Sequence, residues 1–243
     1  MAVTDTPIDS EESVARSAGK QRAIYALYAL VLLASLIYVF SLVAGRTGSG
    51  TSGGAVDVAN NSVTTTLRQE PPQLDAGRST DASSFVVLAH VMEGLLAYDD
   101  NMQLIPGMAE RWEVREDGAT FWIRDEALWS NGDSVTAHDF EFAWKRVVDP
   151  DTASEYAFIL YPILNAEAIT QGELPKEMLG VQAVDDQTLE VQFAQPTPYF
   201  DKLVAFNTYL PLQQEFYEST DGRYGADAEY MIYNGPYVVE EWI

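Results

Sequence analysis

The residue types that carry most enzymatic and metal chemistry are scarce in this chain. Cysteine is absent, and His90 and His138 are the two histidines. Neither has a carboxylate or histidine partner at metal-ligand spacing, and His138 is expected at a surface or capping position in the first turn of a helix. The lack of cysteine excludes disulfides, thiolate-bound metals, a thiol nucleophile and a lipid-modified cysteine anchor. No G-x-S-x-G elbow, P-loop or G-x-G-x-x-G motif occurs. The residue types therefore predict neither a catalytic centre nor a cofactor.

Acidic residues are abundant, but they form no recognisable site. There are 37 acidic against 14 basic residues, for a formal net charge of −23. Such a chain repels nucleic acid and is not attracted to anionic lipid surfaces. A glycosidase-like carboxylate pair could be imagined among so many acids, yet the sequence favours none, since most fall on outward positions of expected strands and helices. Asp99-Asp100-Asn101 resembles a turn, without the glycine and glutamate of a calcium loop.

The stretch Glu110–Val148 holds the clearest pattern of secondary structure. Glu110–Arg115 and Thr120–Arg124 alternate apolar and polar residues at the period of half-buried strands. Glu116-Asp117-Gly118 between them predicts a hairpin turn, because Asp-Gly readily adopts positive φ. Ser130-Asn131-Gly132-Asp133 predicts a second turn.

An amphipathic helix is predicted directly after that second turn. Thr136 is the expected N-cap, with Asp139 at the N3 position of a capping box. Phe140, Ala143, Trp144 and Val147 line one face at helical spacing. Asp149-Pro150 is expected to end the helix.

The rest of the chain predicts a mixed α+β or α/β fold. Thr-rich and apolar runs, proline positions and turn signals indicate the remaining elements. These are a strand at Val63–Leu67, a helix capped by Ser83 or Ser84 and running through Leu96, short helices at Ala153–Leu160 and Leu164–Gln171, a hairpin of Val181–Val184 and Thr188–Phe193, a helix with Pro198 in its first turn, a helix at Gln213–Ser219, and a last strand at Val238–Ile243.

The N-terminal part predicts a membrane anchor. Residues 1–22 form a polar tail, and residues 23–44 carry no charge. A helix of that length spans roughly 33 Å, close to the thickness of the bilayer hydrocarbon core. Arg16, Lys20 and Arg22 precede it, so the positive-inside rule places the tail in the cytoplasm. Residues 45–61 are rich in Gly, Ser and Thr and predict a flexible linker. A cleaved signal peptide, with small residues at Val43-Ala44-Gly45, is the alternative.

Several segments, taken together, resemble one family, the substrate-binding proteins of ABC-type oligopeptide and dipeptide importers (extracellular solute-binding protein family 5). The resemblance covers residues 63–243, and the segments follow the family's order. They are Leu74-Asp75, Glu93-Gly94-Leu95-Leu96, Leu104 to Trp112 (LIPGMAERW), Trp129 to Phe140 (WSNGDSVTAHDF), Trp144 to Ser154 (WKRVVDPDTAS), Leu179-Gly180-Val181, Pro196 to Phe200 (PTPYF) and Asn234-Gly235-Pro236-Tyr237.

The resemblance implies a type II periplasmic-binding-protein-like lobe with an inserted small subdomain. Residues 62–95 and 213–243 would belong to the first ligand-binding lobe, and residues 96–212 to the subdomain. Such receptors close around their ligand by a hinge motion, and an extended peptide would be held largely as an added β-strand.

The resemblance also carries over four ligand-binding positions. Tyr156 matches a tyrosine that lines the peptide site, and a packing role at a helix edge is its alternative. Thr80, Asp81 and Ala82 match a segment that runs beside the bound peptide. Thr80 stands where the closest oligopeptide binders can have Glu, so the resemblance does not define the backbone-amine or side-chain contact made there. The implied partners are a peptide ligand and ABC permease subunits, for a monomeric receptor outside the cell membrane.

Family members continue well past the strand ending at Ile243, through the groups expected to hold the peptide termini. The chain is therefore interpreted as an N-terminal fragment that by itself binds peptide weakly or not at all. The alternatives are a membrane-anchored peptide sensor or cell-wall-peptide receptor and, from a different class, a secreted hydrolase.

Overall fold

The computed structural model describes residues 66–242 and, before them, Leu33, Ser35, Tyr38, Val56–Asp57 and residues 62–64. The chain divides into two compact units, Met1–Thr66 and Leu67–Ile243.

In the first unit, the strands β1 (Val56–Asp57) and β2 (Ser62–Val63) pair antiparallel. The strand predicted at Val63–Leu67 is therefore wrong in extent: β2 ends at Val63, because its partner is only two residues long. Within the described positions there is no helix with the length and apolar character needed to cross a membrane. The predicted tail (1–22), most of the predicted anchor (23–44) and most of the predicted linker (45–61) lie outside the described residues.

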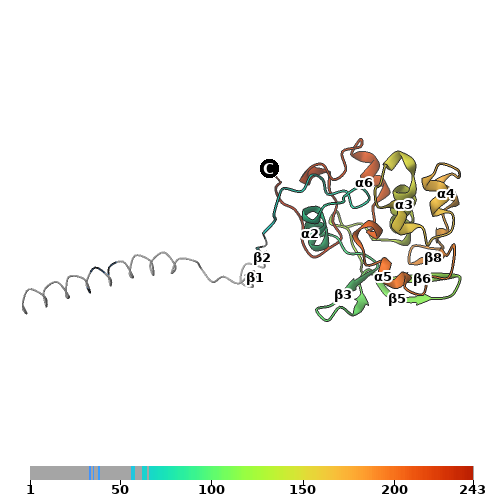
Figure 1. The fold of residues 1–243 in the computed structure, drawn as a ribbon, viewed down its shortest axis with the longest axis horizontal. Coiled ribbons are helices and arrows are strands. Elements are labelled where there is room, and N and C mark those ends of the chain that lie inside the picture. The colour runs from blue at the N-terminus through green and yellow to red at the C-terminus, as the bar shows by residue number, and fades with distance from the viewer. Residues whose placement is uncertain are drawn as a thin grey trace, which may run out of the picture. The chain divides into compact units, whose positions relative to one another are not determined.

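The second unit is built on a four-stranded antiparallel sheet (Figure 1). Its strand order is β5-β6-β8-β7. The strands are β5 (Ala109–Val114), β6 (Gly118–Ile123), β7 (Val181–Ala183) and β8 (Thr188–Gln192). Both predicted hairpins are confirmed, and they join because β6 also pairs with β8, with Phe121 opposite Leu189. These two side chains are buried, so the inward face of the sheet contributes to the core.

Gly118 has a role that differs from the predicted one. It is the first residue of β6 and is not among the described residues with positive φ. A Cβ at this position would lie 2.2 Å from the Val191 carbonyl oxygen. Glycine is therefore needed here because the backbone of β8 approaches closely, and not for a left-handed turn.

The helix α3 (Ala137–Val148) packs against β7 and β8. Its predicted capping box is confirmed: Asp139 Oδ2 accepts the Thr136 N–H at 2.7 Å. Trp144 is fully buried, and its Nε1 donates to the Tyr209 carbonyl at 2.9 Å. The predicted apolar face of this helix is confirmed as core.

The helix α2 (Ala82–Val91) differs from its predicted form at both ends. Its N-cap is Asp81, and Ser84 is the residue that Asp81 binds. The helix ends at Val91 and not at Leu96, because tertiary hydrogen bonds take the backbone groups that follow. Glu93 N donates to Asn234 Oδ1 at 3.0 Å, and Met108 N donates to the Gly94 carbonyl at 2.9 Å.

Short elements complete the second unit. The strands β3 (Leu96–Tyr98) and β4 (Leu104–Pro106) pair around the predicted turn at Asp99. The short helices are η1 (Pro150–Thr152), η2 (Ala157–Leu160), α4 (Ala166–Thr170), η3 (Lys176–Met178), α5 (Phe200–Leu203), η4 (Asn207–Tyr209), α6 (Gln214–Ser219) and η5 (Ala228–Tyr230).

Four predictions are corrected in this part of the chain. The helix expected to hold Pro198 in its first turn begins only at Phe200, with Tyr199 as its N-cap. The helices predicted at Ala153–Leu160 and Leu164–Gln171 are shorter, because Ala153 and Asn165 adopt positive φ. The strand predicted at Val238–Ile243 is not formed over residues 238–242. Residues 238–242 are in none of the described sheets, and a β-strand needs a hydrogen-bonded partner.

Candidate functional site

The predicted site residues Thr80, Asp81 and Ala82 surround the start of α2. Thr80 and Ala82 are exposed, whereas Asp81 is half-buried. The Asp81 carboxylate accepts the Ser84 N–H at 2.9 Å, and the Ser84 hydroxyl lies 2.6 Å from its other oxygen. Although partial burial opposes ionisation, these hydrogen bonds lower the pKa of Asp81 below its ordinary value. Asp81 therefore caps the helix as an anion and fixes where the exposed Thr80 and Ala82 lie.

Tyr156, the other predicted residue, lies in a cluster of aromatic rings beside α2. We call Phe85, Tyr156, Phe158 and Phe206 the aromatic shelf. Phe85 and Tyr156 are stacked with their ring centroids 6.0 Å apart. Phe206 meets Phe85 edge-on at 5.5 Å and Tyr156 at 5.9 Å, and Phe158 meets Tyr156 at 5.9 Å. The structure thus brings Tyr156 next to the helix that Asp81 begins.

Three separate parts of the chain place these rings. Phe85 is in the first turns of α2, and its N–H donates to the Asp81 carbonyl at 3.2 Å. Its own carbonyl accepts from Asn207 Nδ2 at 3.1 Å, which ties α2 to the residue following Phe206. Tyr156 is the residue before η2 and accepts the Ile159 N–H at 3.0 Å. Hydrogen bonds to main-chain carbonyl groups therefore fix the backbone beside the rings.

The shelf is open to solvent. Phe158 is 55% exposed and Phe206 is 37% exposed, which is unusual for large apolar side chains grouped together. Aromatic rings arranged in this way bind apolar or planar groups through their faces and edges. The arrangement is suited to holding a side chain of a ligand by contact.

Phe85, Phe158 and Phe206 were not predicted from the sequence. Phe85 and Phe206 are separated by more than a hundred residues, and no local pattern joins them. The available signal was weak: Phe158 is two residues from the predicted Tyr156, and Phe85 follows the predicted Asp81 by four residues.

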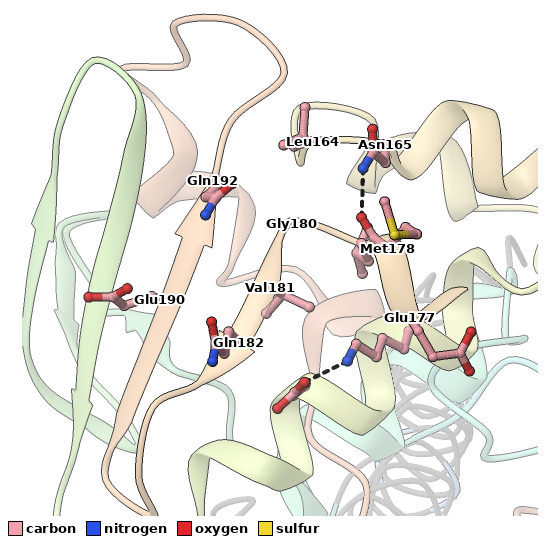
Figure 2. Close-up of a pocket in the computed structure, with 12 residues that line it drawn as sticks. Leu164, Asn165, Glu177, Met178, Gly180, Val181, Gln182, Glu190 and Gln192 are labelled. Carbon is pink, nitrogen blue, oxygen red and sulfur yellow. Dashed lines mark hydrogen bonds and ion pairs between the residues drawn. The ribbon is translucent and has the colours of Figure 1, made fainter. Parts of the chain in front are cut away.

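A hollow of about 480 Å³ opens between β7, η3 and α3 (Figure 2), and none of the shelf residues lines it. Three of its charged and amide side chains bind one another or nearby backbone groups. Lys145 Nζ lies 2.5 Å from Glu141 Oε1, the other Glu141 oxygen accepts the Ala183 N–H at 2.9 Å, and Asn165 Nδ2 donates to the Met178 carbonyl at 2.7 Å. None of the four predicted site residues lines this hollow. The aromatic shelf is therefore the stronger candidate.

Across the residues that the structure describes, no group of three or more His, Cys, Asp or Glu side chains is placed to hold a metal ion.

Comparison with known proteins gives the class of fold: the structural neighbours are type II periplasmic binding proteins of mixed α/β architecture. Residues 103–243 match the bacterial extracellular solute-binding proteins, family 5 Middle. The chain belongs to this family. The predicted resemblance to the substrate-binding proteins of peptide importers is thereby confirmed.

Individual relatives agree with this assignment. The oligopeptide-binding protein OppA of Bacillus subtilis (strain 168) is 36% identical over 217 residues, covering 86% of this chain and 40% of that protein. The substrate-binding domain of an oligopeptide ABC transporter from Bacillus anthracis str. Ames has a TM-score of 0.72 and 48% identity, covering 74% of this chain and 35% of that chain. Listeria monocytogenes OppA bound to peptide has a TM-score of 0.69 and 35% identity, covering 72% of this chain and 35% of that chain. The chain thus spans about two fifths of the length of the curated relative.

Proposed function

We propose that this chain is part of the extracytoplasmic substrate-binding component of an ABC-type importer, which captures oligopeptides or dipeptides and delivers them to the permease. The observation that carries the proposal is the aromatic shelf. It joins the start of α2, where Thr80, Asp81 and Ala82 lie, to Tyr156. Family membership and the relatives named as oligopeptide-binding proteins support the same ligand class.

In this proposal the peptide passes along the exposed residues before α2 and places one side chain on the shelf. Its main chain is extended and forms backbone hydrogen bonds, while the rings of Tyr156, Phe85 and Phe206 contact the side chain. Contact with ring faces and edges is tolerant of sequence, since it needs area and not a specific donor or acceptor. Such a site accommodates many peptides.

We further propose the division of the chain into parts of one lobe and an inserted subdomain. Residues 62–95 and 213–243 are joined by backbone hydrogen bonds: Leu74 N donates to the Gly225 carbonyl at 2.7 Å, and Gly235 N donates to the Val91 carbonyl at 3.0 Å. The four-stranded sheet and α3 both fall within residues 96–212. These two facts support the proposed boundaries.

The proposed mode of attachment is a single membrane-spanning helix at residues 23–44, with the second unit outside the cytoplasm and acting as a monomer. The uncharged run and the basic residues before it support this. N-terminal sequencing of protein extracted from membranes tests the anchor. A mature N-terminus near Gly45 would show cleavage and exclude it.

Peptide binding is tested by calorimetry on the complete protein with a mixed pool of tri- to pentapeptides. Saturable binding is expected for the wild type, and Tyr156→Ala should weaken it about tenfold, the usual effect of truncating an aromatic contact residue. Tyr98→Ala is the matched control, because Tyr98 is an exposed ring (41%) on β3, outside the shelf. A flat titration with wild-type protein would refute the peptide assignment. Equal losses in both variants would refute the role of the shelf.

A further inference from the structure

One buried ion pair connects the segments that lead to two of the three parts of the aromatic shelf, Phe85 and Tyr156. Asp75 is 2% exposed and Arg146 is 8% exposed. The guanidinium binds the carboxylate in a fork, with Nη1 2.9 Å from Oδ1 and Nη2 2.5 Å from Oδ2. The Tyr217 ring covers the guanidinium at 4.4 Å. The two residues are 71 positions apart in the chain.

Asp75 organises the segment that leads to α2. Its carboxylate also accepts the Gly77 N–H at 3.0 Å, and its carbonyl accepts the N–H groups of Arg78 at 3.0 Å and Ser79 at 2.8 Å. The turn formed in this way ends directly before Thr80. The position of Asp75 therefore determines where Thr80, the Asp81 cap and Phe85 lie.

Arg146 organises the segment that leads to Tyr156. It is in the last turn of α3, and its carbonyl accepts the Asp149 N–H at 3.2 Å. Asp149 then caps η1, and Tyr156 follows η1 four residues later. The Asp75–Arg146 pair thus joins the segment that leads to Phe85 to the segment that leads to Tyr156.

Stability alone is a poor explanation for such a pair. Removing two charges from water is costly, and well-packed apolar residues of similar volume often serve as well or better. What an apolar pair would not supply is a fixed geometry. The two parallel hydrogen bonds of an arginine–carboxylate fork set both the distance and the orientation of the groups that they join.

We propose that Asp75 and Arg146 are positioning residues for peptide binding, which hold the α2 side of the aromatic shelf in register with the Tyr156 side. The inference rests on the proposed function. Neither side chain touches the peptide. They act through the spacing of Phe85 and Tyr156, so that loss of the fork loosens the shelf even in a protein that stays folded.

The test measures peptide affinity of the complete protein with the same peptide pool. Arg146→Lys keeps the charge but loses the fork, and Asp75→Asn keeps the shape but loses the charge. Each should weaken binding about tenfold at a temperature at which every variant is folded. Leu189→Ala is the matched control, since Leu189 is fully buried in β8 and outside the shelf. It should lower the melting temperature but leave affinity within about twofold.

A double-mutant cycle separates positioning from general destabilisation. If Arg146 acts through Tyr156, then Arg146→Lys should cost less than about threefold in affinity when Tyr156→Ala is already present. The inference would be overturned if Arg146→Lys cost as much affinity with Tyr156→Ala present as without it. It would also be overturned if both Asp75→Asn and Arg146→Lys bound peptide as tightly as the wild type does. If the wild type binds no peptide, the proposed function fails and this inference falls with it.

Discussion

The two ends of α3 hold buried charged groups in different ways. At the N-terminal end, Asp139 Oδ2 accepts hydrogen bonds from the Thr136 N–H at 2.7 Å and from Trp129 Nε1 at 3.2 Å. All of these donors are uncharged and lie within ten residues of Asp139. At the C-terminal end, Arg146 binds a carboxylate from a distant part of the chain.

The difference is visible in the direction of the pKa shifts. Burial raises the pKa of Asp139 above its ordinary value, because the neutral donors offset only part of the cost of burying the anion. Burial alone would lower the pKa of Arg146, but the hydrogen bond and charge of Asp75 outweigh it and raise that pKa. The N-terminal end is stabilised by local dipoles, and the C-terminal end by a long-range charge pair. Both ends fall within segments that resemble the family, and the second is the one that we propose positions the candidate site.

The largest effect is expected from breaking the C-terminal end. Arg146→Met should destabilise the complete protein by about 3–5 kcal/mol, because it leaves the Asp75 carboxylate buried without a partner charge. Urea unfolding followed by tryptophan fluorescence measures this. Adding Asp75→Asn to Arg146→Met removes the orphaned charge and should recover part of the loss. A double variant less stable than Arg146→Met would contradict the account of the pair.

A smaller effect is expected at the N-terminal end. Asp139→Ala removes the acceptor for Thr136 and Trp129 and should cost about 1–2 kcal/mol, as for the loss of other helix caps. Asp139→Asn keeps one acceptor oxygen and should cost less. The same urea experiment ranks the variants. An equal loss of stability in Asp139→Ala and Arg146→Met would contradict the proposed difference between the two ends.

The pH dependence of stability provides a third comparison. Because the folded-state pKa of Asp139 is raised above its ordinary value of 3.8, the folded protein holds this proton more tightly than the unfolded chain does. As pH rises from 3.8 through the raised pKa, this residue therefore makes an increasingly unfavourable contribution. The stability of wild type relative to Asp139→Asn should fall with pH over that window. Parallel curves for the two proteins would exclude the raised pKa.

The contrast between interactions that are local in sequence and interactions with distant residues also explains how far the sequence predicts the structure. The hairpins, the Ser130–Asp133 turn and the capping box at Thr136 were predictable, because each depends on residues close in sequence. The strand predicted at Val238–Ile243 was wrong, because its pattern satisfied a local rule but no described strand pairs with it.

The candidate site was predicted less completely than the fold. Tyr156 and the segment 80–82 came from the family resemblance, and their roles as ligand contacts stay predictions. Phe85 and Phe206 could not be found, because their neighbourhood depends on how α2 packs against a distant segment. The cap at Asp81 was missed in favour of Ser83 or Ser84, since all three residues are good caps. The Ser84 hydroxyl is instead bound to the Gln73 carbonyl at 2.6 Å, a contact that the local sequence pattern does not show.

The smallest effect is expected just beyond the C-terminal end of α3, where Asp149 and Lys176 form an ion pair at 2.6 Å. Lys176 is 45% exposed, so Asp149→Asn should cost less than about 1 kcal/mol near neutral pH, as is usual for partly exposed pairs. Although burial opposes ionisation of Asp149, the hydrogen bond from Lys176 and the Asp151 N–H lower its pKa. Its contribution is therefore present above pH 3.8 and lost as pH falls through the lowered pKa. The stability difference between wild type and Asp149→Asn should shrink in acid, opposite in sign to the trend for Asp139. If the stability difference between wild type and Asp149→Asn instead grew as pH fell, the lowered pKa of Asp149 would be excluded. The contrast with Asp139 would then be wrong.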